Sequence, residues 1–456
     1  MTETQQRRNK RKSRTGFRDA MGAWYALDNA ASIMPAISNR IGTSLFRVSA
    51  TLDAPVKLSV LEEALVHTAK RFPYFTVELH RGLFWYYLEP FTGRLHVVAD
   101  ADSPSQNFDV NQKGTCLFRI RAKERRIAGE FSHTLTDGTG GFRFFKNLLV
   151  EYFRLQGIEP KDGPSGPDPD IYDLSAKPDP EEYEDSYNRC FHDKFPIPDS
   201  GRHAIHLQSA RIPPYNYRIT TGIIPLKAAL DYAKSQKVTL TELFAALFMD
   251  AFESIYFASS EKARKHMPRY AAIEVPVNMR QFYPTKSNRN FSLFVLITED
   301  LWLGRRDFTD ILERTHYQMK LEVDKKSILR QISRNVGGSR LGIVRITPLF
   351  IKDFFAHLFF ASMGESLLST FISNIGPVSM PEGPAEHIER FDFLPAPSMT
   401  TLTNAAMLSW KGNIYLDFGS LAVSREVERC VLTRLRSLGI PVKVECNMPL
   451  EGPEGE

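Results

Sequence analysis

Residues 131–138, with the sequence FSHTLTDG, bring together the side chains of this chain that are best suited to proton transfer. In the extended segment that ends there, alternation directs Phe131 and His133 to one apolar face and Glu130 and Ser132 to the other. An imidazole at the end of a strand, beside apolar side chains, is partly removed from water and still reachable from a cleft. These conditions suit a general base near neutral pH. The pattern therefore predicts His133 as a candidate base.

Asp137 and the glycines after it occupy the expected turn into a helix. A carboxylate at that turn can hold it through a salt bridge or through hydrogen bonds to backbone amides. Gly138, Gly140 and Gly141 allow another part of the chain to approach closely. A lone histidine at a strand end is more often structural than catalytic, and the spacing H-x-x-x-D-G can arise by chance. The position at a strand-to-helix turn favours the functional interpretation.

The elements expected in the first half place this turn between a strand and a helix. Residues 59–62, SVLE, form a capping box that opens a helix ended by Pro73. A helix with an apolar face is expected over residues 139–153. The expected strands, the second and third of which form a hairpin, are residues 43–51, 75–79, 83–88, 115–122 and 126–133.

Residues 158–199 differ in composition from the segments on either side. They contain eight prolines, twelve acidic residues and four basic residues. Such a segment buries little apolar surface, so we expect an exposed connection between two halves of the chain.

The second half is expected to begin near His203. Residues 239–242, TLTE, form another capping box, which opens an apolar helix. Ser424 is expected to cap a last helix that Gly439 ends. The expected strands are residues 270–277, 291–298 and 370–374, followed by a hairpin of 401–409 and 414–419. Strands and helices in both halves predict two α/β layers rather than one barrel.

The composition is that of a globular protein, with 43% hydrophobic and 24% charged residues among 456. The four cysteines are widely spaced and include no CxxC, which argues against a disulfide scaffold and fits a reducing cytoplasm. The chain contains no apolar run of the length that a membrane-spanning helix needs, and no apolar region follows the basic N-terminus as in a secretory signal. We therefore expect a cytoplasmic protein.

The net charge of +5 is concentrated near the N-terminus. Residues 1–18 hold seven basic residues and one acidic residue, so the rest of the chain is close to neutral. We interpret residues 1–18 as a disordered tail that is dispensable for chemistry and whose charge favours weak contact with anionic membranes. Since the body shows no basic stripe, we expect no nucleic-acid partner.

Four motifs occur in an order that resembles the chloramphenicol acetyltransferase-like superfamily, which includes condensation domains, alcohol acetyltransferases and plant BAHD acyltransferases. The motifs are HxxxDG from His133 to Gly138, PVNMR ending at Arg280, SNIGP beginning at Ser373 and Asn374, and DFG at Asp417, Phe418 and Gly419. The resemblance spans residues 20–440. Ser132 stands where condensation domains carry a second histidine, and Ser420 stands where BAHD enzymes continue DFGWG.

The resemblance implies a mixed α/β fold in which two chloramphenicol acetyltransferase-like subdomains meet at a central channel around His133. The expected division is a tail at 1–18, an N-terminal subdomain at 19–157, an acidic linker at 158–202, a C-terminal subdomain at 203–446 and a tail at 447–456. It also implies that Asp137 and Gly138 are structural, that Asp137 pairs with Arg280, and that the DFG motif is structural. Ser373 and Asn374 are implied as oxyanion or substrate contacts.

The implied activity is acyl transfer from acyl-CoA to the hydroxyl of a small alcohol, with His133 as general base. No metal and no cofactor other than acyl-CoA as co-substrate are implied. Two alternatives remain open. One is a condensation-like enzyme that takes its acyl group from an acyl carrier protein, with an amine as a further kind of acceptor. The other is a non-catalytic binding protein on the same fold.

Other motif interpretations fit the sequence less well. DFG also occurs in protein kinases, but the chain lacks the Gly-rich loop and the HRD segment that kinases need. Residues 138–141, GTGG, lack the dinucleotide-binding spacing. Residues 190–192, CFH, and 203–206, HAIH, lie in or beside the acidic segment, and we expect no metal site there.

Overall fold

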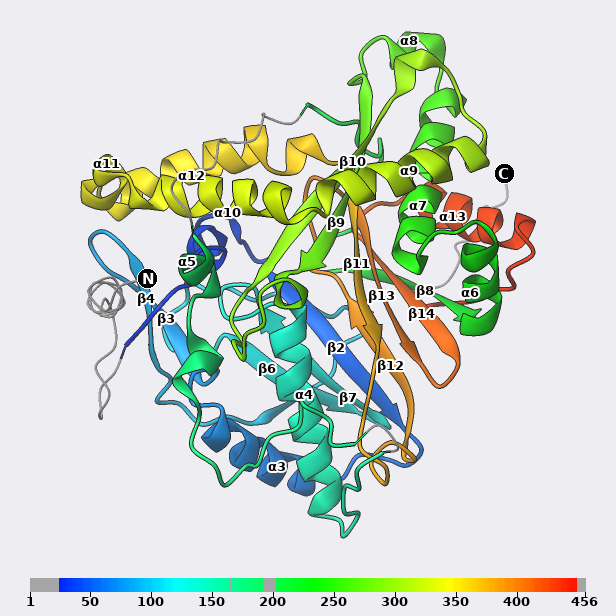
Figure 1. Cartoon of the computed structure of the whole chain (residues 1–456). Helices are drawn as coiled ribbons and strands as arrows, with labels where there is room; N and C mark the ends of the chain where they lie inside the picture. The colour runs from blue at the N-terminus through cyan, green and yellow to red at the C-terminus, as the bar shows by residue number, and fades with distance from the viewer. Residues whose placement is uncertain (1–23, 164–165, 192–201, 449–456) are drawn as a thin grey trace, which may run out of the picture.

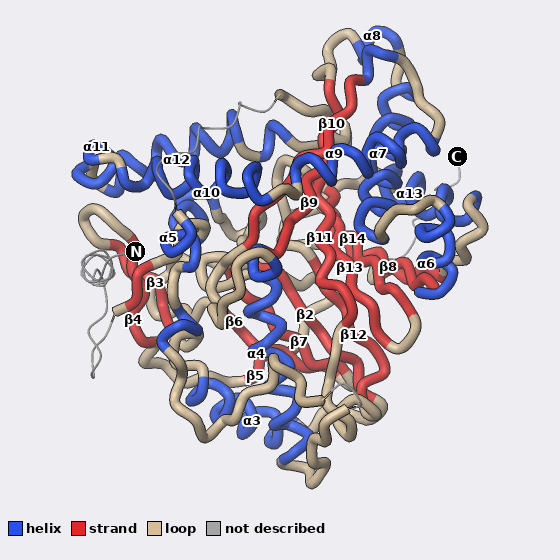
Figure 2. The backbone as a smooth tube through the Cα atoms, in the orientation of Figure 1, coloured by secondary structure: helices blue, strands red, loops and turns tan. Residues whose placement is uncertain are grey.

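The computed structural model describes residues 24–163, 166–191 and 202–448. This part of the chain forms two large sheets and a small one, with helices packed on their faces (Figures 1 and 2). The expected mixed α/β class with two subdomains is confirmed. The basic tail expected at residues 1–18 lies outside the described residues, as do residues 449–456 of the expected C-terminal tail.

The first large sheet carries the strand that leads to His133. Its strand order is β12–β2–β7–β6–β5, and helices α3 (Leu58–Arg71) and α4 (Gly138–Arg154) enclose a shared core with it. The strands are β2 (Leu45–Leu52), β5 (Val97–Ala99), β6 (Phe118–Lys123), β7 (Arg126–Ser132) and β12 (Ile388–Leu394).

Strand β7 buries both of its faces. Phe131 packs on Phe144 of α4, with ring centroids 5.7 Å apart. On the opposite face the fully buried Glu130 accepts hydrogen bonds from Arg119 at 2.5 Å and from Arg47 and Arg121 at 3.2 Å. The expected alternation is confirmed, and the buried carboxylate is stable because three guanidinium groups surround it.

One predicted helix start is wrong and another is confirmed. Helix α3 begins at Leu58 with Lys57 as its N-cap and no side-chain cap bond, so Ser59 lies inside the first turn instead of capping it. Helix α7 (Leu240–Ala258) has the expected box, in which Thr239 and Glu242 each bond the backbone N–H of the other.

The second large sheet has the order β10–β9–β11–β13–β14–β8–β15. Its strands are β8 (Arg218–Pro225), β9 (Tyr270–Asn278), β10 (Ser292–Asp300), β11 (Thr370–Pro377), β13 (Thr403–Trp410), β14 (Asn413–Ser420) and β15 (Lys443–Cys446). The apolar core on one face includes α7, α6 (Leu226–Ser235), α9 (Phe308–Glu322) and α13 (Glu426–Ser437).

Strand β12 departs from the expected division of the chain. It comes from the range assigned to the C-terminal subdomain, yet it pairs with β2 and completes the N-terminal sheet. Its Phe391 is fully buried and lies 5.6 Å from the ring of Phe142 on α4. The C-terminal range therefore contributes one strand to the N-terminal sheet, and neither subdomain is a continuous stretch of sequence.

The acidic segment is less exposed than predicted. In its described part Glu182 is buried and accepts from Arg71 at 2.7 and 2.8 Å and from Tyr74 at 2.6 Å. Tyr187 is also buried, and its hydroxyl donates to the carbonyl of Ser292. The segment packs because its carboxylates accept hydrogen bonds from arginines of the N-terminal subdomain. Composition alone does not show that these pairs form.

Several elements lie outside these two layers. The small sheet has the order β1–β4–β3, and three helices that the sequence analysis did not predict run together along one side of the molecule (Figure 1). These elements are β1 (Tyr25–Ala26), β3 (Val77–Arg81), β4 (Tyr86–Pro90), α10 (Lys325–Arg340), α11 (Gly342–Ile346) and α12 (Leu349–Met363). The short helices are α2 (Met34–Ile37), α5 (Ser186–Cys190) and α8 (Glu261–Arg264). Within the described ranges no helix combines the length and apolarity needed to cross a membrane.

Candidate active site

His133 follows directly after β7, where its side chain is half-buried. Its backbone N–H donates to the carbonyl of Ser44 at 3.0 Å, and its ring lies 4.8 Å from the ring of Phe46, centroid to centroid. Ser132 is fully buried, with its hydroxyl 2.7 Å from Ser44 Oγ and accepting from the N–H of Thr134 at 3.1 Å. The hydroxyl of Ser132 is thus occupied within the fold, whereas the imidazole keeps some access to solvent.

Asn290, just before β10, fixes the orientation of the imidazole. Its Nδ2 donates to Asp28 Oδ2 at 2.8 Å and to the carbonyl of His133 at 2.9 Å. Its Oδ1 therefore faces His133 Nδ1, at 3.4 Å. In this arrangement the proton of the neutral ring is on Nδ1, and Nε2 is the basic nitrogen.

Neither Asn290 nor Asp28 is predicted from the sequence as a site residue. Asn290 is 157 positions from His133, and Asp28 is 262 positions from Asn290. The only local signal is the polar run SNRN at residues 287–290, directly before an apolar strand. All four of these side chains are buried, which is rare for such residues unless they have a structural or functional role.

Burial lowers the pKa of His133 below its ordinary value, because solvent that would stabilise the imidazolium is removed. The hydrogen bond to Asn290, the charge of Asp137 and the backbone of Thr136 act in the opposite direction and are weaker. The ring is therefore neutral, and able to accept a proton, at neutral pH.

Asp137 forms the ion pair expected with Arg280. Its Oδ2 lies 2.8 Å from Arg280 Nη1 and its Oδ1 lies 3.3 Å from Nη2, and both side chains are buried. The carboxylate also accepts from the N–H groups of Gly140 at 3.0 Å and Phe291 at 2.8 Å. Burial alone would raise the pKa of Asp137, but Arg280 and these amides hold it below its ordinary value. Asp137 thus joins the start of α4 to β9 and β10.

The glycines at the start of α4 allow the close approach that the sequence suggested. A Cβ added at Gly140 would lie 2.2 Å from the carbonyl oxygen of Asn288. That carbonyl accepts from the Thr136 hydroxyl at 2.6 Å. A Cβ at Gly138 would lie 3.0 Å from Ile375 of β11, which brings the SNIGP strand beside the start of α4.

The structure treats Ser373 and Asn374 differently. The amide of Asn374 donates to Thr241 of α7 at 2.9 Å and accepts from the N–H of Gly376 at 2.8 Å, where the register of β11 shifts. Its side chain is therefore used within the C-terminal subdomain. Ser373 is half-buried and pairs with Ala406, which packs in the core of the N-terminal subdomain. Ser373 consequently lies on the face of the sheet directed toward that subdomain.

The DFG motif joins the two sheets. Asp417 is fully buried, accepts from the N–H of Phe393 in β12 at 3.0 Å and from Thr221 at 2.5 Å. Burial, and then the nearby Asp392 carboxylate, raises the pKa of Asp417. Phe418 is fully buried in the C-terminal core.

Gly419 leaves space for the hydroxyl of Tyr217. A Cβ at this position would lie 1.9 Å from that oxygen, which donates to the carbonyl of Pro395 at 3.0 Å. A side chain at position 419 would therefore displace the Tyr217 ring and its hydrogen bond to Pro395.

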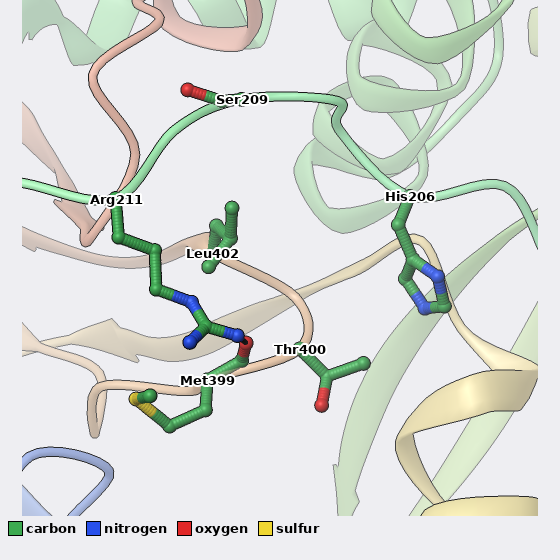
Figure 3. A pocket seen from close by; sticks show the side chains of 6 residues that line it. All are labelled: His206, Ser209, Arg211, Met399, Thr400 and Leu402. Carbon is green, nitrogen blue, oxygen red and sulfur yellow. Dashed lines mark hydrogen bonds between the residues drawn. The ribbon is translucent and has the colours of Figure 1, made fainter.

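Two cavities lie away from the imidazole. One, of about 620 Å³, is shown in Figure 3, where the Arg211 guanidinium reaches the loop at Met399 and donates to its carbonyl at 3.0 Å. This cavity is lined by His206, Ser209, Arg211, Met399, Thr400 and Leu402. The other, of about 300 Å³, lies in the N-terminal subdomain among residues such as Leu65 and Phe108. Neither has His133 in its lining.

No group of three or more histidine, cysteine, aspartate or glutamate side chains with the spacing of a metal site occurs in the described part of the chain. The four cysteines are all free thiols.

Comparison with known proteins finds similarity at the level of structure. No family model and no curated protein sequence matches this chain. Trichothecene 15-O-acetyltransferase TRI3 from Fusarium sporotrichioides is similar over 91% of this chain and 94% of its own, with 11% identity and a TM-score of 0.56. TRI101 of F. sporotrichioides, solved with coenzyme A and T-2, is similar over 92% and 99%, with 11% identity and a TM-score of 0.59.

The structure is also similar to that of a condensation domain. The first condensation domain of the calcium-dependent antibiotic synthetase, solved with a substrate analogue, is similar over 92% of this chain and 96% of its own, with 13% identity and a TM-score of 0.57. The order of the four motifs and the similarity to these solved structures point to the same fold. The chain has the two-subdomain chloramphenicol acetyltransferase-like fold of the condensation domains and trichothecene acetyltransferases.

Proposed function

We propose that this protein transfers an acyl group from acyl-CoA to the hydroxyl of a small-molecule acceptor, with His133 as the general base. The observation that carries the proposal is the state of the imidazole: half-buried, with a lowered pKa, and held by Asn290 so that Nε2 is the basic nitrogen. The fold shared with acetyltransferases supports it.

In the proposed reaction Nε2 of His133 takes the proton of the acceptor hydroxyl while that oxygen attacks the thioester carbonyl carbon. The tetrahedral oxyanion needs a hydrogen-bond donor, and Ser373 is the candidate on the facing sheet. As the carbon–sulfur bond breaks, the imidazolium returns its proton to the leaving thiolate. No acyl-enzyme is required, because bound donor and acceptor react directly.

In this proposal Asp137 and Arg280 do not touch substrate and act by positioning other residues. Their ion pair fixes the start of α4 relative to β10, and therefore the position of Asn290, two residues before that strand, beside His133. Asn374 and the DFG motif stabilise the fold without touching substrate.

A second candidate function is supported by the condensation domains among the similar structures. In this alternative the acyl donor is a thioester on a carrier protein and the acceptor is an amine. The same histidine would serve as base. Condensation domains carry a further histidine directly before the base. In this chain that position is Ser132, whose buried hydroxyl is bonded to Ser44.

The proposed function is tested by incubating the purified protein with acetyl-CoA and a panel of alcohols, while the release of free thiol is followed. We expect His133→Ala to reduce turnover by about a hundredfold to ten-thousandfold. Ser132→Ala is the matched control and should keep most of the turnover. A folded His133→Ala variant that remains active would contradict the role of base. Turnover with a loaded carrier protein but not with acyl-CoA would favour the second candidate.

A further inference from the structure

An exposed apolar surface lies where the β3–β4 hairpin meets α12, and the proposed reaction does not use it. It is formed by the tip of the β3–β4 hairpin together with α11 and the first turns of α12. Six of its side chains, each between 45% and 70% exposed, are Leu83, Trp85, Ile343, Ile346, Phe350 and Phe354. We call this set the apolar face. Large aromatic and aliphatic side chains gathered in this way mark an interaction site more often than a plain surface.

Specific contacts hold the hairpin tip against α12. The N–H of Leu349 donates to the carbonyl of Leu83 at 2.8 Å. Lys352 Nζ donates to the carbonyl of Phe84 at 2.8 Å and lies 3.4 Å from the centre of the Trp85 ring. These contacts hold parts of the chain that are more than 260 positions apart in one surface.

Asp353 adds two further contacts to the same joint. Its Oδ2 accepts from Arg81 Nη2 at 2.6 Å and from the Tyr86 hydroxyl at 2.9 Å. The exposed apolar side chains are therefore pre-arranged, and a ligand that covers them need not order them first.

The chain segment that supplies the helices of the apolar face is basic. Residues 325–352, which contain α10, α11 and the start of α12, include seven basic residues and no acidic residue. None of the seven makes a salt bridge with a described residue, and Arg340 and Arg345 are exposed. The net charge of residues 19–456 is close to zero, yet these residues include the strongly basic segment 325–352.

The described part of the chain begins beside the same hairpin. The chain enters the described part at Trp24, whose ring lies 6.2 Å from Tyr87, and β1 pairs with β4 of the hairpin. Figure 1 shows this entry beside the hairpin and below the three helices. Residues 1–18, which carry a net charge of +6, precede this point in the sequence.

We propose that the apolar face docks this protein on an anionic lipid bilayer. Trp, Phe and aliphatic side chains on a hairpin tip and a helix enter the headgroup boundary, while nearby arginines and lysines attract anionic headgroups. The cation–π contact of Lys352 with Trp85 joins an aromatic ring and a positive charge in the arrangement favoured at such a boundary. The proposal goes beyond the acyl transfer above and does not depend on it.

Charge also argues against a second copy of this chain as the occupant. A two-fold contact through the apolar face would bring the basic segments of two copies together, and like charges at an interface cost binding energy. Nucleic acid would satisfy the charge but not the exposed aliphatic side chains. An anionic bilayer satisfies both.

The test is flotation of the full-length protein with vesicles of phosphatidylcholine alone and of phosphatidylcholine mixed with phosphatidylserine. We expect binding to the mixed vesicles, weakened by salt, and much less binding to the neutral ones. The triple variant Ile346→Ser, Phe350→Ser, Phe354→Ser should lower the partition coefficient at least about tenfold, because three apolar side chains no longer insert.

A matched control is Trp302→Ser with Leu303→Ser, which removes exposed apolar side chains, 67% and 65% exposed, from another part of the surface. This control should bind as the unchanged protein does. Circular dichroism and acetyl-CoA turnover with a soluble alcohol show that each variant is folded, so the outcome for vesicles is separate from that for catalysis.

Three results would overturn the proposal. One is equal binding by the triple variant and the unchanged protein. Another is binding that deletion of residues 1–15 abolishes while the triple variant retains it, because the tail alone would then be the anchor. The third is a dimer in light scattering that the triple variant converts to a monomer while vesicles bind neither form.

Discussion

Burial controls the protonation of His133, and with it the pH range in which the proposed base can accept a proton. Because the pKa is lowered, the ring stays neutral to a lower pH than an exposed histidine, whose pKa is about 6.5. We expect kcat/KM to be constant at neutral pH and to fall about tenfold per pH unit as the pH drops through the lowered pKa. A pH–rate profile with a soluble acceptor measures this. An acidic limb above the ordinary histidine range would contradict the role of desolvation.

Asn290 is predicted to be a positioning residue for that base. In Asn290→Ala the imidazole loses the acceptor for its Nδ1 proton, so kcat should fall by about tenfold to a hundredfold. Since the bond to Asn290 raises the pKa of His133, its loss should also move the acidic limb to lower pH. A purely structural defect would not shift the limb. The measurement is the pH profile of the folded variant beside that of the unchanged protein.

The candidate site was only partly predictable from sequence. His133, Asp137 and Arg280 are found because short motifs bracket them, and the ion pair between the last two is confirmed. Asn290 has no motif around it, and its role comes from two hydrogen bonds to a residue that only the fold brings near. The SNIGP motif points to Ser373 and Asn374 together as candidates. In the structure their side chains have different surroundings, at the irregularity in β11.

At the level of elements, the ion pair of Asp137 and Arg280 fixes the start of α4 against β9 and β10. Removing either partner leaves a buried charge, so Asp137→Ala and Arg280→Ala should each cost about 3–5 kcal/mol of unfolding free energy. The double variant should lose clearly less than the sum of the two. Urea denaturation of the four proteins measures this coupling. Strictly additive losses would mean that the pair contributes no interaction energy.

Helices and strands were predicted correctly where a local sequence pattern is enough to define them. The Thr239 box is present because its glutamate is three positions on and an apolar helix follows, while the same pattern at Ser59 lies one residue inside its helix. Strand β12 was not predicted, because its charged residues break the apolar alternation. It is held by pairing with β2, more than 300 positions earlier, which no local pattern encodes.

At the level of the whole molecule, β12 makes the two halves depend on each other, because a strand of the C-terminal half pairs in the N-terminal sheet. Strand β2 has β7 on one side and β12 on the other. Ile388 and Phe391 of β12 and Trp410 of β13 belong to the same core as α4. The fold therefore resists division at the acidic segment, although composition suggests a boundary there.

This dependence predicts the behaviour of the separated halves. Residues 1–202 alone would leave the β12 side of the apolar strand β2 unpaired and would remove several core side chains, each worth about 2–5 kcal/mol. Since a native protein has about 5–15 kcal/mol of stability in total, the fragment should show no cooperative unfolding and should aggregate. Co-expression with residues 203–456 should restore a complex that unfolds cooperatively, because β12 is then available to pair with β2. Thermal denaturation followed by circular dichroism and light scattering compares the fragment, the co-expressed pair and the intact chain. A monomeric 1–202 fragment with a sharp transition would show that β12 is dispensable for the N-terminal sheet.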